Sequence, residues 1–255
     1  MTVDGALLMW LWPMLLGTLG AIMGSFLATL AIRWPQDRSV VRGRSACDAC
    51  GRTLGASELV PIISAMASRG RCRTCGAAID WRHPGIELGC ALVGVSAGLV
   101  APGWTGVAGA GFGWLLLTLA AIDLAEFWLP DPLVAALALT GIASALWVPP
   151  AADERVIGGA LGFALLWAVS AGYWRIRGRE GMGGGDPKLF GAIGLWLGWR
   201  LLPAVLVIAA LVGLGVALFK HLRGRDIAAD TALPFGAFLA VAAYPTWLAM
   251  IAWTP

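Results

Sequence analysis

Long apolar segments separated by turns and short charged loops run along almost the whole chain. Most of them approach the length at which a helix crosses the ~30 Å hydrocarbon core of a bilayer. The segments cover residues 7–32, 86–101, 103–122, 132–149, 156–174, 189–199, 201–219 and 233–253. We therefore predict an all-α polytopic membrane protein with about eight transmembrane helices, of which 189–199 is short for a full span and 86–101 is marginal.

Composition supports this class of protein. The 255 residues are 59% hydrophobic and only 13% charged, whereas soluble domains are nearer a quarter charged. We expect membrane lipid, and no nucleic acid, around the chain. The first apolar run begins near Leu7 with no basic residue before it and is long enough to span as a permanent helix. We therefore expect no cleaved signal peptide.

The basic residues predict an orientation. If alternate loops lie on alternate sides, all of the 18 lysines and arginines except Arg155 and Arg200 fall on one side. Short basic loops face the cytoplasm. We therefore expect a bacterial inner-membrane protein with both termini periplasmic and with Asp123, Asp131 and Asp186 at the cytoplasmic face.

The sequence predicts three parts: a first transmembrane helix over 1–32, a cytoplasmic loop domain over 33–84, and a helical membrane core over 85–255. The loop is the one sizeable polar region, and it contains two C-x-x-C pairs, each followed by a glycine. Four thiolates at this spacing suit tetrahedral zinc. The four cysteines are Cys47, Cys50, Cys72 and Cys75.

Two disulfides are the alternative for these cysteines, and a reducing cytoplasm disfavours them. A closed four-cysteine site leaves no ligand position for water, so we predict a structural zinc. Such a metal supplies folding free energy to a loop too small to build its own core.

Asp123 ends the apolar run 115–122, and Asp186 ends the glycine run Gly183–Gly185. A carboxylate beside a bilayer is expensive and usually functional. The structural alternatives are an interfacial carboxylate for Asp123 and a helix cap for Asp186. The glycines would let another chain lie extended beside Asp186.

Two neighbouring residues have weaker functional claims. For Asp131, which precedes Pro132, we favour a helix N-cap. Lys188 either points inward, where its ammonium would favour ionisation of the aspartates, or extends to the interface.

In order along the chain, these motifs resemble the type IV prepilin peptidases. The matching segments are Gly24-Ser-Phe-Leu27 to Arg33-Trp-Pro35, the paired cysteines with Pro61-Ile-Ile-Ser64 between them, Gly70-Arg-Cys72, His83-Pro84 through Glu87, Asp123 with Leu129-Pro-Asp131, Gly183-Gly-Gly-Asp186 with Lys188-Leu189, and Leu233-Pro-Phe-Gly236.

The resemblance implies that Asp123 and Asp186 form a catalytic dyad, supported by Gly183, Gly185 and Lys188. It implies removal of the basic leader from type IV prepilins or type II secretion pseudopilins, cleaving after the leader's last glycine. It further implies N-methylation of the new terminus from S-adenosylmethionine. Glu87 is a candidate cofactor residue by resemblance; its alternative is an ordinary interfacial charge.

The chain departs from the family pattern at three places. Ala28 replaces the usual asparagine, His83 replaces the usual tyrosine, and the last motif continues Phe235-Gly-Ala237 without a second proline. The first two lie in or near the part associated with methylation, so a peptidase without methyltransferase activity remains an alternative.

Two other classes of protein remain open. An ion-coupled transporter would use intramembrane carboxylates as relays, but it usually has internal repeats and polar residues near the bilayer midplane. Neither feature is evident here. The other alternative is a non-enzymatic zinc-loop scaffold for a secretion apparatus.

Overall fold

The computed structural model describes residues 3–40, 44–179, 181–224 and 232–253. These residues form helices and irregular loops, with no β-strand in the described ranges beyond two isolated bridges. The chain divides into two compact units, Met1–Ala121 and Ile122–Pro255, and the division falls within one helix. The all-α class predicted from the apolar runs is confirmed.

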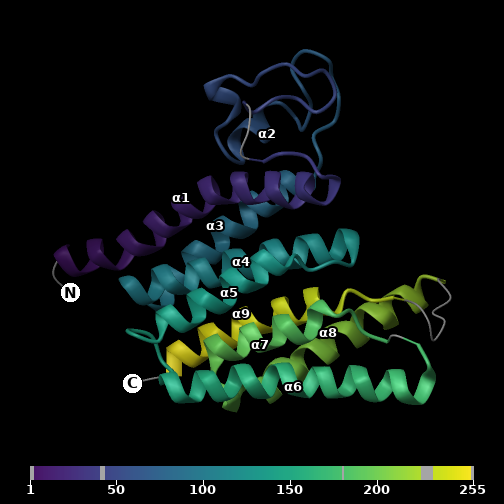
Figure 1. Cartoon of the computed structure of the whole chain (residues 1–255). Coiled ribbons are helices and arrows are strands. Elements are labelled where there is room, and N and C mark those ends of the chain that lie inside the picture. The colour runs from purple at the N-terminus through teal and green to yellow at the C-terminus, as the bar shows by residue number, and fades with distance from the viewer. Residues whose placement is uncertain (1–2, 41–43, 180, 225–231, 254–255) are drawn as a thin grey trace. The chain divides into compact units, whose positions relative to one another are not determined.

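The first unit is built on two long helices and a loop region. Its helical elements are α1 (Val3–Arg33), η1 (Trp34–Gln36), η2 (Ala56–Glu58), α2 (Ile63–Ala67), α3 (Arg82–Val100) and most of α4 (Trp104–Glu126). Helices α1 and α3 lie side by side (Figure 1). Small residues allow their backbones to approach closely, since a Cβ at Gly94 would lie only 2.0 Å from the Leu16 carbonyl oxygen.

The second unit surrounds a short central helix. After the end of α4 it contains α5 (Asp131–Ser144), α6 (Ala152–Arg177), α7 (Gly185–Leu197), η3 (Trp199–Leu201), α8 (Leu202–Leu222) and α9 (Phe235–Trp253). Helix α7 packs against α5, α6 and α9 (Figure 1), and nearly all of its residues are buried. A Cβ at Gly194 would meet the Gly158 carbonyl oxygen at 2.2 Å, so α6 and α7 also touch through their backbones.

Each of the eight predicted apolar segments is helical, but the count of eight membrane spans is not confirmed. Six described helices are long and apolar enough to cross a membrane. Helix α5 has 14 residues and α7 has 13, about 20 Å at 1.5 Å per residue, which is short of a bilayer core. The chain is a multi-pass membrane protein whose buried α7 is sheltered by other helices.

Candidate active site and metal-binding loop

Asp123 and Asp186 meet around a single glycine at the start of α9. A Cβ built on Gly236 would lie 3.0 Å from Asp186 Oδ1 and 3.1 Å from Asp123 Oδ2. The two carboxylate oxygens are therefore no more than about 6 Å apart, comparable to the span of one water molecule hydrogen-bonded to both. Both side chains are buried, with 5% and 6% of their residue surface exposed. The structure thus brings together the two aspartates singled out by sequence.

Backbone groups hold the two aspartates in place. Ala237, in the first turn of α9, donates its N–H to Asp123 Oδ2 at 2.7 Å. The first N–H groups of a helix have no intrahelical partner, and the helix dipole favours a negative charge there. Asp186 lies in the first turn of α7, where its own N–H donates to the Gly183 carbonyl oxygen at 3.1 Å.

The glycine run before Asp186 is non-helical over residues 181–184, and α7 begins at Gly185. A Cβ at Gly183 would lie 3.6 Å from Asp186 Oδ2, an ordinary contact. A Cβ at Gly185 would lie 2.9 Å from Leu129 Cβ, which is too close. Gly185 is therefore required by packing, whereas Gly183 leaves open backbone beside the carboxylate.

Lys188 is directed at Asp131. Its Nζ donates to Asp131 Oδ1 at 2.7 Å and to Oδ2 at 3.0 Å, and both side chains are largely exposed. Asp131 is the first residue of α5, the N-cap position is Pro130, and no side-chain cap bond forms. The predicted N-cap role of Asp131 is therefore wrong, because its carboxylate binds the Lys188 ammonium instead.

The four cysteines of the two C-x-x-C pairs form one cluster. Their sulfur atoms lie within 4.8 Å of one another, and the Sγ atoms of Cys47 and Cys75 are 3.9 Å apart. Tetrahedral zinc with Zn–S bonds of 2.3 Å places its sulfurs about 3.8 Å apart, whereas a disulfide needs about 2.05 Å. All five cysteines of the chain are free thiols. The geometry fits a metal ion and disfavours the disulfide alternative.

The two halves of the cluster repeat one local structure. In the first, Gly51 N–H donates to the Cys47 carbonyl oxygen at 2.9 Å, and Gly51 has φ of 71°. In the second, Gly76 N–H donates to the Cys72 carbonyl oxygen at 2.9 Å, and Gly76 has φ of 71°. Positive φ favours glycine, which explains the glycine after each pair.

The loop's electrostatics favour thiolates at two of the four positions. Hydrogen bonds from the backbone N–H groups of Cys75 and Thr74 lower the pKa of the Cys72 thiol to about 6. Backbone N–H groups of Cys50 and Ala49 likewise lower the pKa of Cys47. At Cys75 a hydrogen bond from the Ala77 N–H lowers the pKa. The Cys72 side chain and burial have a larger, opposite effect and raise the pKa of Cys75 to about 11. A cation is needed to hold all four as thiolates.

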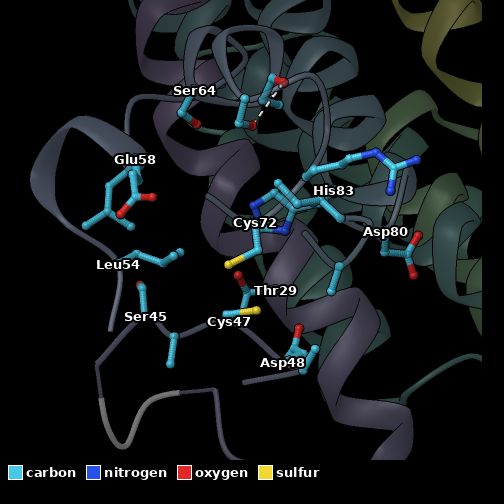
Figure 2. A pocket seen from close by; sticks show the side chains of 18 of the residues that line it. Thr29, Ser45, Cys47, Asp48, Leu54, Glu58, Ser64, Cys72, Asp80 and His83 are labelled. Carbon is cyan, nitrogen blue, oxygen red and sulfur yellow. Dashed lines mark hydrogen bonds between the residues drawn. The ribbon is translucent and has the colours of Figure 1, made fainter. Parts of the chain in front are cut away.

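A cavity of about 450 Å³ opens beside the cysteine cluster, lined by α1, the loop and the start of α3. Figure 2 shows Cys47, Cys72 and His83 projecting from different segments into this pocket. Arg52 forms a bidentate ion pair with Glu58 at 2.7 and 3.1 Å, and that partner strongly lowers the pKa of Glu58 to about 2. The Nε atom of Arg52 is buried without a hydrogen-bond partner among the described residues.

Glu87 lies on α3 where that helix borders the cavity. Its residue surface is 3% exposed, Oε2 accepts the N–H of Ile62 at 2.7 Å, and Oε1 lies 3.3 Å from His83 Nε2. Ser25 Oγ of α1 lies 3.4 Å from the same nitrogen. Ile62 has φ of 63°, a conformation that a branched side chain rarely adopts. Glu87 thus fastens a strained turn of the loop to the helices.

A helical membrane protein that pairs two buried aspartates at helix ends and carries a four-cysteine loop fits the class of membrane aspartic peptidases. Two family models match in succession: "Bacterial Peptidase A24 N-terminal domain" over residues 18–100 and "Type IV leader peptidase family" over residues 110–218. The chain belongs to the type IV leader peptidase family. The first match contains the cysteines and Glu87, and the second contains both aspartates.

Several curated relatives carry the name "Prepilin leader peptidase/N-methyltransferase". One from Burkholderia pseudomallei is 43% identical over 199 residues, 77% of this chain. One from Aeromonas hydrophila is 38% identical over 215 residues, 82% of this chain and 71% of the relative. One from Pseudomonas putida is 33% identical over 262 residues, 91% of this chain and 88% of the relative. The matched part spans 64% of the Burkholderia protein. No solved structure matches the chain.

Sequence reasoning missed some of the residues that build these sites. The motif containing Gly236 was noted, yet nothing indicated that its glycine separates the two carboxylates. Leu129 was named only as the first residue of a matching segment, and Arg52 only as one of the basic residues of one side. Each acts through a tertiary contact, which a single sequence does not reveal, although the ordered family motifs around Leu129 and Gly236 marked the right segments.

Proposed function

We propose that the chain is a membrane aspartic endopeptidase that removes the leader of type IV prepilins or type II secretion pseudopilins. The observation that carries this proposal is the approach of the Asp123 and Asp186 carboxylates around Gly236. The names of the relatives supply the substrate class. The predicted orientation, with the aspartates and cysteine loop cytoplasmic and both termini periplasmic, belongs to the same proposal.

The reaction is acid–base hydrolysis without a covalent intermediate. Two nearby carboxylates cannot both ionise cheaply, so the pair holds one proton. The ionised aspartate takes a proton from water as its oxygen attacks the scissile carbonyl carbon. The protonated aspartate donates its proton to the carbonyl oxygen. When the peptide C–N bond breaks, the first aspartate gives the proton from water to the leaving amine, and the second takes its proton back from the hydroxyl as the carbonyl re-forms, so the pair again holds one proton. The open backbone at Gly183 provides a place for an extended substrate strand.

The test is cleavage of a purified prepilin by the detergent-solubilised chain, followed by the mass of the substrate. Asp123→Asn and Asp186→Asn should each lower kcat by at least about a thousandfold, and the double variant should be no worse, since the pair acts as a unit. Normal cleavage by either single variant contradicts the assignment. Unchanged substrate mass with the wild-type chain favours the transporter or scaffold alternatives.

We further propose that the 450 Å³ cavity binds S-adenosylmethionine for N-methylation of the new terminus, and that the cysteine cluster holds a structural zinc ion. The cavity volume lies in the range of small-molecule sites. The unpartnered Arg52 Nε suits a ligand carboxylate, and the buried Glu87 carboxylate suits a cationic group. When bound, S-adenosylmethionine would supply an electrophilic methyl group. Glu87 and Arg52 would hold the cofactor and orient it.

Calorimetry with S-adenosylmethionine tests this second proposal independently of turnover. Glu87→Gln keeps an oxygen for the Ile62 N–H but removes the charge, so affinity should fall at least tenfold and methylation should be lost while the leader is still removed. Glu154→Gln is a matched control, because Glu154 pairs with Arg200 in the other unit. Equal affinity for wild type and Glu87→Gln overturns the assignment of Glu87.

A further inference from the structure

Leu129 lies between the two helix ends that hold the aspartates. It belongs to the connector between α4 and α5, where Phe127 has φ of 53° and is 55% exposed. Leu129, two residues later, is only 6% exposed. The connector thus directs one leucine side chain inward within a few residues of Asp123.

Two glycines leave the space that this leucine fills. At the start of α7, a Cβ on Gly185 would lie 2.9 Å from Leu129 Cβ and 3.2 Å from Cδ1. At the start of α9, a Cβ on Gly236 would lie 2.8 Å from Leu129 Cδ1. Gly185 precedes Asp186, and Gly236 precedes the residue whose N–H binds Asp123. One side chain therefore separates the start of α7, which carries Asp186, from the start of α9, whose Ala237 N–H binds Asp123.

We propose that Leu129 is a positioning residue for the aspartate pair, acting as a spacer between Gly185 and Gly236. Its side chain limits how closely the starts of α7 and α9 approach and resists their separation by filling the gap. The distance between the carboxylates follows from the spacing of those helix ends. A displacement of about 1 Å at a catalytic group can lower a rate about a hundredfold, so the spacer controls turnover without contacting the substrate.

This inference rests on the proposed peptidase function. If the wild-type chain does not cleave a prepilin, the proposed function fails and this inference fails with it. If the wild type cleaves and its Asp→Asn variants do not, the behaviour of Leu129 variants decides this inference alone.

The experiment compares Leu129→Ala with Leu137→Ala, which removes an equally buried leucine from α5 in the same unit. The Leu137 carbonyl oxygen accepts a bond from Trp196, near the opposite end of α7 from Asp186. A spacer role predicts that Leu129→Ala lowers kcat ten- to a hundredfold with KM within threefold of wild type. Leu137→Ala should change kcat less than threefold. Equal losses of kcat in the two variants would show a merely structural role and overturn the proposal.

A second-site test adds a readout that general destabilisation does not produce. Gly236→Ala introduces a Cβ that must displace Leu129 Cδ1 or the two carboxylate oxygens, so kcat should fall at least tenfold. Combined with Leu129→Ala, the new methyl group loses its closest contact, the one with Leu129 Cδ1 at 2.8 Å, and the start of α9 can shift into the vacated space. The kcat of the double variant should therefore exceed the product of the single effects by at least tenfold. Simple multiplication of the two losses overturns the proposal. If Leu129→Ala does not fold, Leu129→Val, which shortens the side chain and removes Cδ1, takes its place in both comparisons.

Discussion

The Ala237 N–H donates to Asp123 Oδ2 across 114 positions of sequence, at 2.7 Å. This bond ties the end of α4 to the start of α9 with a group that α9 itself does not use, because the first N–H groups of a helix are free. A charge-assisted bond of this kind favours an ionised acceptor. The bond therefore favours the ionised form of Asp123, the form that can accept a proton from water.

Ala237→Pro removes that donor and adds the bulk of the proline ring. Proline is tolerated in the first turn of a helix, so α9 should persist in circular dichroism while kcat for cleavage falls about a hundredfold. Ala237→Val keeps the N–H with similar added bulk and should retain most of the activity. Equal loss of cleavage in both variants would mean that bulk, and not the missing hydrogen bond, is responsible.

The ion pair of Lys188 and Asp131 makes a different prediction. Exposed pairs contribute about 0–1 kcal/mol, and the Lys188 ammonium is directed at Asp131. Lys188→Met should therefore leave kcat within about threefold of wild type and its pH profile unchanged. Lys220→Met, in the last turn of α8, is the control. A shifted pH profile for Lys188→Met alone would place the ammonium at the aspartate pair during turnover.

The sequence predicted the local features well, because their signals are local. Apolar runs predicted the helices, and C-x-x-C-G spacing predicted a cluster whose knuckles each depend on a glycine with positive φ. The number of membrane-spanning helices could not be predicted from the apolar runs, because an apolar run does not reveal whether lipid or protein surrounds it. Helix α7 is the example: most of its 13 residues are apolar, and other helices of the protein enclose them.

The tertiary contacts of the site residues could not be predicted from the sequence. The spacing of Asp123 from Asp186 depends on Gly236 and Leu129, which are far apart in the chain and meet only in the fold. Arg155 was assigned only to the side with few basic residues. In the structure it is 1% exposed and donates to six oxygens, five of them backbone carbonyls of turns and helix ends, which have no sequence signature.

We therefore predict that Arg155 stabilises the fold. Arg155→Met leaves buried acceptors at the ends of α5 and α7 without donors, each unsatisfied group costing about 1–3 kcal/mol. The free energy of unfolding, measured in mixed micelles, should fall by at least about 3 kcal/mol. Arg200→Met, at an exposed arginine paired with Glu154, should lose no more than about 1 kcal/mol. Similar losses for both would mean that the buried network adds nothing to stability.

Removal of the metal should separate the two proposed activities. Cys47 and Cys72 belong to the cluster and also line the cavity, so loss of the metal should unfold the loop and abolish S-adenosylmethionine binding. The aspartate pair lies in the other unit, so prepilin cleavage should stay within about fivefold of wild type. Cys72→Ser or a strong chelator should release one zinc per chain, measured by mass spectrometry of the metal, and expose the loop to protease.

Cys90→Ala is the control, because Cys90 is buried in α3 outside the cluster. This variant should keep the zinc ion, the binding of S-adenosylmethionine and the resistance of the loop to protease. Unchanged S-adenosylmethionine affinity in zinc-free protein would contradict both the structural role of the metal and the assignment of the cavity.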